Sequence, residues 1–293
     1  MNRLYILVGA ALTAITGAQD YHVEIAQRTS PQGPATTIDP LTSINDRREC
    51  AFTGLDTTGV SRGFMVTEQG VASAITFGSA TRNFAGAAIN NEIPARVATR
   101  DRVSSTWLMR RWPADGSQTW VVVGRSPTHF DSCSQWLDVN DSSNIVFVAL
   151  TQGSTRSALL FGTAEPPLQI ADFAGIPLLR PQLSNDYTAR GGRGARVVVR
   201  DGSNQIVVFD ALASATGRVM AGPTVGGFTA VGPYPGISHD GEVVTFIGNR
   251  GSGEVRRSSA LSSRTMAQPS TRLSPRCCGP SVLQRRPHNC GTF

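Results

Sequence analysis

Two Arg-Asp pairs supply the charged groups that ligand binding or proton transfer would need. Arg100-Asp101 and Arg200-Asp201 each follow a run of apolar residues, and Asp56 lies at a comparable place earlier in the chain. A guanidinium next to a carboxylate can bind a polar ligand, and carboxylates act as the acid and base of many enzymes that cleave polysaccharides. We therefore predict Arg100, Asp101, Arg200 and Asp201 as ligand-binding residues.

Tryptophan is the second residue type that suggests a binding site, because its large ring anchors many interfaces and sugar sites. Trp112 begins the sequence Trp-Pro-Ala-Asp-Gly, which is a strong turn signal. We predict that Trp112 lies at a loop tip and belongs to a binding face. Trp107 and Trp120 fall in expected strands, where core packing explains them equally well, and Trp136 follows shortly after.

Two further motifs that could carry chemistry are explained by turns. Residues 59–63 fit Gly-x-Ser-x-Gly, but the nucleophile elbow of α/β-hydrolases needs a helix after it, and here a strand is expected. Asp138, Asn140, Asp141 and Asn144 offer oxygen ligands for calcium, yet the central Gly and distal Glu of a calcium loop are missing. We predict no catalytic residue, no metal and no cofactor.

A repeated turn organises the chain. Asn-Asp and similar pairs tolerate left-handed backbone and reverse the chain direction before a strand. Such a pair precedes an apolar run five times, at intervals of 45, 50, 45 and 54 residues. The five predicted anchors of this repeat are Asn45, Asn90, Asn140, Asn185 and His239. An insertion at residues 187–194 delays the strand of the fourth copy.

Each of the first four copies contains several short apolar segments after its anchor. In the second copy they are residues 95–98, 106–109, 120–123 and 133–137. Four strands in about 47 residues match one blade of a β-propeller, and runs that are apolar on both faces suit strands buried between sheets. We predict an all-β fold, a β-propeller or incomplete propeller of four to five blades. A sandwich or stacked β-solenoid is the alternative.

The repeat also resembles a known family. Residues 237–241 (Ile-Ser-His-Asp-Gly), with Asn-Asp at 45–46 and 140–141, look like the repeats of secreted bacterial β-propellers of the TolB-like and WD40-like type. The resemblance covers about residues 21–249. It implies a scaffold that presents loops to a partner, and it carries over no catalytic residues.

Positive charge is concentrated at one end of the chain. The net charge is +6, and all 27 basic residues are Arg. Residues 251–293 hold seven Arg and one Glu, which leaves 20 Arg and 20 acidic residues in residues 1–250. The body therefore lacks the concentrated positive field that binding to nucleic acid needs. We predict no nucleic-acid partner.

The N-terminus predicts export. Arg3 precedes an apolar run at residues 4–15, and small residues at 16–18 allow cleavage before Gln19. The run is shorter than a membrane-spanning helix, which needs about 20 residues. We predict a secreted or periplasmic protein with no membrane span in the mature chain.

These features divide the chain into three predicted parts. Residues 1–18 form a signal peptide, residues 19–250 the repeat domain, and residues 251–293 a disordered basic tail. The tail lacks a β-branched run of strand length, and an out-of-frame origin is a sharper hypothesis for it. Of the five Cys, Cys50 and Cys133 lie in the body, and we predict no disulfide framework.

The sequence as a whole predicts an exported, non-catalytic repeat protein that binds a protein or glycan partner through blade loops. One alternative is a propeller hydrolase or lyase acting on polysaccharide, favoured by the matching places of Arg100-Asp101 and Arg200-Asp201 in two copies. Another is a cell-surface structural module. Glycan binding without turnover, or product release from a polysaccharide, distinguishes the first two hypotheses.

Overall fold

The fold is built from β-strands. The computed structural model describes residues 33–75, 82–113, 120–174, 180–185, 194–212, 214–250 and 254–262. Every regular element in these residues is a strand, which confirms the predicted all-β class. Within the same residues, no helix has the length and hydrophobicity required to cross a membrane.

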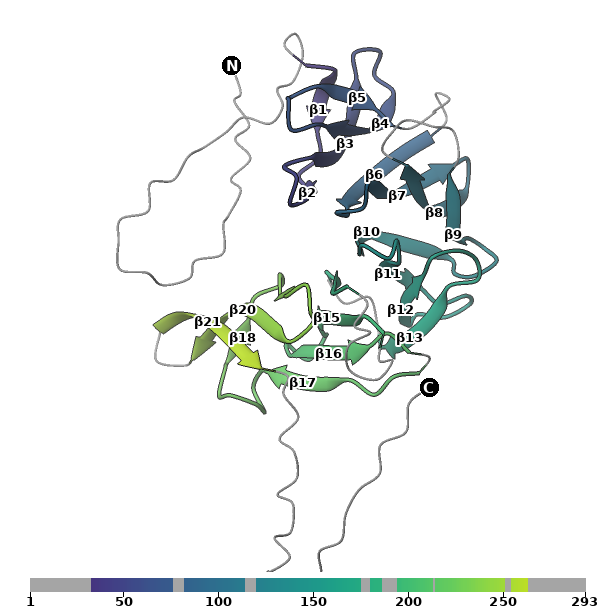
Figure 1. The fold of residues 1–293 in the computed structure, drawn as a ribbon. Coiled ribbons are helices and arrows are strands. Elements are labelled where there is room, and N and C mark those ends of the chain that lie inside the picture. Colours follow the sequence, from purple (N-terminus) through teal and green to yellow (C-terminus); the bar gives the residue numbers. More distant parts are fainter. Residues whose placement is uncertain are drawn as a thin grey trace, which may run out of the picture. The chain divides into compact units, whose positions relative to one another are not determined.

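The strands form five antiparallel sheets in chain order (Figure 1). The first sheet contains β1 (Ala35–Ile38), β2 (Ser43–Ile44), β3 (Cys50–Asp56), β4 (Ser61–Val66) and β5 (Ala72–Ala74). The second contains β6 (Arg82–Ile89), β7 (Arg96–Val103), β8 (Thr106–Pro113) and β9 (Val121–Arg125). The third contains β10 (Ser132–Val139), β11 (Ile145–Leu150), β12 (Ser157–Gly162) and β13 (Leu168–Phe173).

The last two sheets follow the same plan. The fourth contains β14 (Gln182–Leu183), β15 (Arg196–Arg200), β16 (Ile206–Asp210) and β17 (Arg218–Ala221). The fifth contains β18 (Ala230–Val231), β19 (Gly236–Ile237), β20 (Val243–Arg250) and β21 (Glu254–Ser262). In the first and fifth sheets the first position is divided between two short strands, which both pair with the strand that follows. First strands of neighbouring sheets lie close together, since β6 contacts β2 and β10, and β10 contacts β14.

The second strands of the third and fourth sheets, β11 and β15, are buried on both faces, which explains their uninterrupted apolar runs. In β11, Phe147 belongs to a core cluster shared with the second sheet, and its neighbour Val148 belongs to a cluster shared with the fourth. In β15, Val197 and Val198 likewise divide between the clusters toward the third and fifth sheets. Because side chains alternate along a strand, the middle sheets each contribute to two cores.

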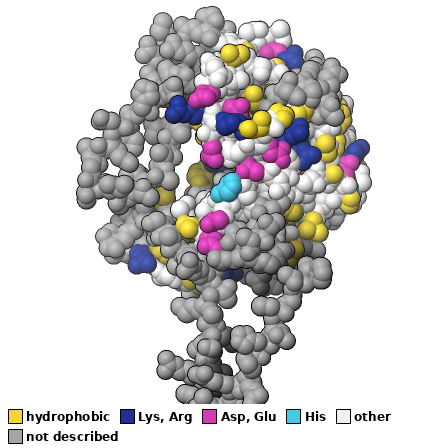
Figure 2. Space-filling model, viewed as in Figure 1, with side chains coloured by type: hydrophobic (Ala, Val, Ile, Leu, Met, Phe, Trp, Pro, Cys, Tyr) yellow, Lys and Arg dark blue, Asp and Glu magenta, His cyan; other side chains and the backbone are white. Residues whose placement is uncertain are grey.

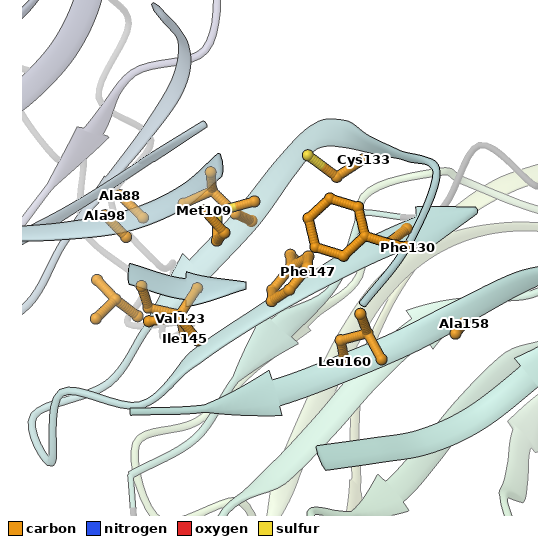
Figure 3. Close-up of a cluster of buried hydrophobic side chains, with 13 residues drawn as sticks. Ala88, Ala98, Met109, Val123, Phe130, Cys133, Ile145, Phe147, Ala158 and Leu160 are labelled. Atoms are coloured by element: carbon orange, nitrogen blue, oxygen red, sulfur yellow. The ribbon is translucent and has the colours of Figure 1, made fainter. Parts of the chain in front are cut away.

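The core between the second and third sheets shows how the faces interlock. Met109 and Val123 of the second sheet pack against Phe130 and Phe147 (Figure 3). The two phenylalanine rings meet edge to face, with their centroids 5.7 Å apart. Such close-packed apolar surface between neighbouring sheets is the main favourable contribution to their association.

A hydrogen-bond ladder joins the turns of successive sheets. Asn45 Nδ2 donates to the carbonyl of Asn90 (2.9 Å), and Asn90 Nδ2 donates to that of Asn140 (2.9 Å). Asn140 Nδ2 in turn donates to the carbonyl of Ser184 (3.1 Å). The Oδ1 atom of each Asn accepts a backbone N–H within its own turn, as from Arg96 to Asn90 (2.7 Å). One side chain thus stabilises a turn and links two sheets.

Serine replaces asparagine in the last two turns. Ser184 Oγ accepts the N–H of Arg196 (2.8 Å), and Ser238 Oγ accepts that of Val243 (2.9 Å). The predicted anchors Asn45, Asn90 and Asn140 are confirmed, whereas Asn185 and His239 each lie one residue too late. The sequence suggested Asn185 and His239 because Asn and His are stronger turn markers than Ser, although a hydroxyl accepts the same backbone hydrogen bond.

The grouping of strands differs from the prediction by one strand. Residues 133–137 were predicted to end the second copy, but they lie in β10 and begin the third sheet. The structure also places β21 in the predicted tail, where it pairs with β20 through the backbone. Backbone pairing does not require β-branched side chains, so the lack of a β-branched run in this segment did not exclude a strand. The remaining predicted domain boundaries, with the signal peptide, lie outside the described residues.

Cys50 and Cys133 are buried free thiols in different sheets. Burial raises the pKa of Cys50 to about 11 and that of Cys133 to about 12. Both therefore pack as small apolar residues.

Replacing Asn90 by Ala should lower the free energy of unfolding by about 1–3 kcal/mol, because the N–H of Arg96 loses its acceptor and the carbonyl of Asn140 keeps only the N–H of Ser143 (2.9 Å) as donor. Asn90→Ser should cost about half as much, since a hydroxyl can still accept the N–H of Arg96. Chemical denaturation measures both effects. Glu68→Ala is the control, because its ion pair with Arg48 is long (4.0 Å) and exposed. Equal stability of the Asn90→Ala and Glu68→Ala proteins would contradict a structural role for the ladder.

Candidate functional site

Two aromatic rings and one guanidinium meet where the first strands of three sheets come together. Trp136 lies on β10, Arg180 lies two residues before β14, and Tyr234 lies between β18 and β19. The Trp136 and Tyr234 ring centroids are 6.0 Å apart. Arg180 Cζ lies 5.3 Å from the Trp136 centroid and 5.1 Å from the Tyr234 centroid. We call these three residues the aromatic–arginine group.

The ladder explains why these residues meet. Trp136, Arg180 and Tyr234 each lie four residues before the turn residue of their sheet, which is Asn140, Ser184 or Ser238. The ladder aligns the turns of the third and fourth sheets, and the N–H of Asn185 donates to the carbonyl of His239 (2.9 Å) in the turn of the fifth sheet. These bonds also align the positions that precede the three turns. The group is therefore one position of the repeat, repeated in three consecutive sheets.

The equivalent residue of the second sheet is Gly86, which has a different role. Its φ is +71°, a backbone conformation that favours glycine. A Cβ atom there would lie 2.1 Å from the backbone oxygen of Gln135 on β10. Gly86 therefore permits close approach of β6 to β10 and leaves this place in the row without a side chain.

A local irregularity in β10 positions Trp136. The pairing of β10 with β11 shifts register between Cys133 and Leu137. Ser134 Oγ accepts the N–H of Trp136 (3.2 Å) and donates to its carbonyl oxygen (3.3 Å). Bulges of this kind reorient side chains near functional sites. Cys133 and Leu137 stay in the core, while Trp136 remains partly exposed.

Asp138 lies two residues beyond Trp136 on the same strand. Its carboxylate accepts the N–H groups of Leu183 (2.8 Å) and Val139 (2.9 Å). Burial raises the pKa of Asp138 to about 6, although these hydrogen bonds and the charge of Arg180 act in the opposite direction. The Leu183 bond also ties β10 to the first strand of the fourth sheet.

Trp112 does not lie at a loop tip, so that prediction is wrong. Its side chain has 0% exposure, and its Nε1 donates to Thr99 Oγ1 (2.8 Å). The turn signal was misleading because β8 continues through Pro113, and alternation then directs the ring inward. Trp112 packs edge to face on Phe84 at 6.1 Å and is part of the core.

The Arg-Asp pairs have structural contacts. Asp101 is buried and forms an ion pair with Arg110 (2.9 Å) instead of binding at the surface. Arg100 Nη1 donates to the carbonyl of Cys133 (3.3 Å), and its guanidinium stacks on Trp107 at 4.6 Å. Burial lowers the pKa of Arg100. Cys133 and Asp39 oppose this shift, and Arg102 adds to it.

The other pair maintains a hairpin. Arg200 donates to Asn204 Oδ1 (2.9 and 3.1 Å), and Asp201 Oδ1 accepts the N–H of Gln205 (2.9 Å). In the first sheet Asp56 likewise holds a hairpin turn, since its Oδ1 accepts the N–H of Thr58. Hydrogen bonds from Thr58 and Arg62 lower the pKa of Asp56. The matching places of these acids thus reflect a shared turn requirement.

The remaining candidate motifs are also accounted for. Ser61, in the Gly-x-Ser-x-Gly segment, lies on β4 and accepts the N–H of Phe84 (2.9 Å) through Oγ. His129 Nδ1 accepts the N–H of Arg125 (3.2 Å). Within the described residues no group of three His, Cys, Asp or Glu side chains could hold a metal ion. On the face shown in Figure 2, basic and acidic side chains are interleaved.

Repeated antiparallel sheets that pack face to face in chain order define an architecture of the β-propeller type. No protein-family model matches the chain, and no curated protein matches it. Among solved structures, TolB from Acinetobacter baumannii is similar, with 11% identity and a TM-score of 0.49. The match covers 72% of this chain and 49% of TolB, so the chain spans about half the length of that protein.

Two other structures have comparable similarity. A mutant of the Aleuria aurantia lectin in complex with α-methyl-L-fucoside is 8% identical with a TM-score of 0.45, over 80% of this chain and 79% of the lectin. A prolyl endopeptidase is 11% identical with a TM-score of 0.48, over 80% of this chain and 35% of the enzyme. The five successive sheets themselves confirm the propeller-type strand arrangement that the predicted resemblance to TolB-like repeats implied. At these identities and TM-scores no ligand or activity carries over.

Arg180 and Tyr234 were not predicted as site residues from the sequence. Both lie four residues before a Ser turn, and the anchors predicted at Asn185 and His239 put them five residues away, out of step with Trp136. A search for hydroxyl as well as amide turn residues would have aligned all three.

Replacing Trp112 by Ala should lower the free energy of unfolding by about 3–5 kcal/mol, as for other large core residues. Trp112→Phe keeps most of the packing and loses the bond to Thr99, so about 1–2 kcal/mol is expected. Thermal and chemical denaturation test both. A Trp112→Ala protein as stable as the parent would mean that the ring is at the surface after all.

Asp138→Asn should stabilise the protein at pH 7 but not at pH 4. The raised pKa means that the folded state binds the proton more tightly, so stability is full below about pH 4 and falls as pH rises through 6. A shift from 3.8 to about 6 corresponds to a loss of about 3 kcal/mol, which Asn avoids while still accepting the Leu183 N–H. Because the amide nitrogen of Asn cannot accept the Val139 N–H, the net gain at pH 7 should be smaller, about 1–2 kcal/mol. Denaturation between pH 4 and 8 measures the difference, with the exposed Asp46→Asn as control. A gain that does not vary with pH would contradict this account.

Proposed function

We propose that this chain is an exported, non-catalytic β-propeller repeat protein that binds a glycan through the aromatic–arginine group. The observation that carries the proposal is the convergence of Trp136, Arg180 and Tyr234 from three sheets. Three residues that pack only for stability would be buried, but Tyr234 is 58% exposed. An exposed Tyr beside a partly exposed Trp and a cation is typical of a ligand-binding surface.

The chemistry of the group suits a sugar. The C–H groups of a pyranose ring form an apolar face that can pack on Trp136 or Tyr234, while guanidinium N–H groups reach the ring oxygens. A protein partner would more often require a well-packed apolar pocket around its anchor residues. Around Trp136 the partly exposed residues of the first strands are polar, as at Gln135 and Gln182.

Binding rather than catalysis is supported by the roles of the charged residues. The polysaccharide hydrolase or lyase hypothesis depended on Arg100-Asp101 and Arg200-Asp201. Asp101 is engaged in a buried ion pair, and Asp201 holds a hairpin turn. These contacts explain the presence of both acids without a reaction. Export is supported by the pattern of residues 1–18, which lie outside the described residues.

Trp136→Ala and Tyr234→Ala should each weaken glycan binding at least tenfold, because each removes one ring face from the site. Binding is measured first on an oligosaccharide array and then by calorimetry with the strongest glycan. The matched control is Trp120→Ala, which removes a partly exposed Trp that also stacks on an Arg and directly precedes β9 of the second sheet. Trp120→Ala should bind as the parent does.

Two results would contradict the proposed function. One is a protein that binds no glycan on the array. The other is a glycan whose affinity is unchanged by Trp136→Ala and Tyr234→Ala but falls with Trp120→Ala. Release of product from the bound glycan would instead support the enzymatic alternative.

A further inference from the structure

Arg180 has a charge that no described residue neutralises by direct contact. In the described part of the chain its guanidinium has no ion pair or hydrogen bond, and its contacts are the rings of Trp136 and Tyr234. Asp138, the acid whose pKa responds to Arg180, is directed to the backbone N–H groups of Leu183 and Val139. As far as the described residues are concerned, the donors of Arg180 therefore remain available to a ligand.

The position of Arg180 next to two rings favours a particular geometry of binding. A guanidinium that packs on an aromatic face keeps its N–H groups at its edge, where they point away from the ring. Two parallel N–H groups at that edge match the two oxygens of a carboxylate. The contacts with Trp136 and Tyr234 also restrict the Arg180 side chain, which lowers the entropy lost when it binds.

The two rings offer faces beside this donor. Their planes are inclined at 57° with centroids 6.0 Å apart, so neither ring covers the other as in a parallel stack. A ligand that contacts Arg180 can therefore pack an apolar face on one ring. Among the described residues Arg180 is the one cation stacked on these rings, which suits a singly charged carboxylate better than a doubly charged phosphate.

We propose that the aromatic–arginine group binds an acidic sugar residue, with Arg180 holding the carboxylate and Trp136 or Tyr234 packing on the pyranose ring. This inference rests on the proposed glycan-binding function and specifies the class of glycan. It assigns a carboxylate-binding role to Arg180.

The test uses the full chain and an array of uronate and sialate oligosaccharides, each paired with its methyl ester. The array contains trigalacturonate, an alginate trimer, a hyaluronan tetrasaccharide and sialyllactose. For at least one pair the acid should bind at least tenfold more tightly than its ester. Arg180→Gln should remove this preference while binding of the ester changes less than twofold, and Arg180→Lys should restore only part of it. Arg102→Gln is the matched control, because Arg102 also stacks on a tryptophan, at 4.8 Å from the Trp107 centroid.

The outcomes separate the two proposals. Binding of esters as tight as that of the acids would overturn the carboxylate assignment and leave glycan binding intact. An acid preference that survives Arg180→Gln would place the carboxylate elsewhere and overturn the inference. If no sugar binds, both proposals fail, and binding of poly-glutamate in that case would identify an acidic protein as the partner. Melting temperatures of the variants confirm that each is folded.

Discussion

The asparagine ladder is the interaction on which the arrangement of the sheets depends. Each of Asn45, Asn90 and Asn140 accepts a hydrogen bond from its own turn and donates one to the turn of the next sheet. Apolar packing alone resists separation of two sheets but permits sliding, because it has little directional preference. A buried amide that must satisfy both partners sets the offset between neighbouring sheets.

This offset has a consequence for function. Once the turns are aligned, residues at the same distance from each turn meet at the first strands, as Trp136, Arg180 and Tyr234 do. The large cores between the sheets provide the rigidity that holds these residues in place. A binding site can then arise by substitution at one repeat position without any change in the core.

Much of the fold could be predicted from local sequence. Asn45, Asn90 and Asn140 were identified because turn chemistry acts within a few residues, and most strands of the middle sheets were found because burial on both faces leaves continuous apolar runs. The ligand-binding residues could not be found in this way. Trp112 and Asp101 look like surface candidates in sequence, but the direction of a strand side chain depends on register, and register places both inside.

By itself the sequence determined the all-β class, the length of the repeat and three of its five turns, since each follows from the conformational preferences of short segments. Only the tertiary structure decided which strand begins each sheet, that Ser184 and Ser238 continue the line of turns, and that Trp136, Arg180 and Tyr234 meet. These depend on contacts between residues more than 40 positions apart, as from Asn45 to Asn90. No local preference specifies which distant partner a backbone carbonyl or an aromatic ring will contact.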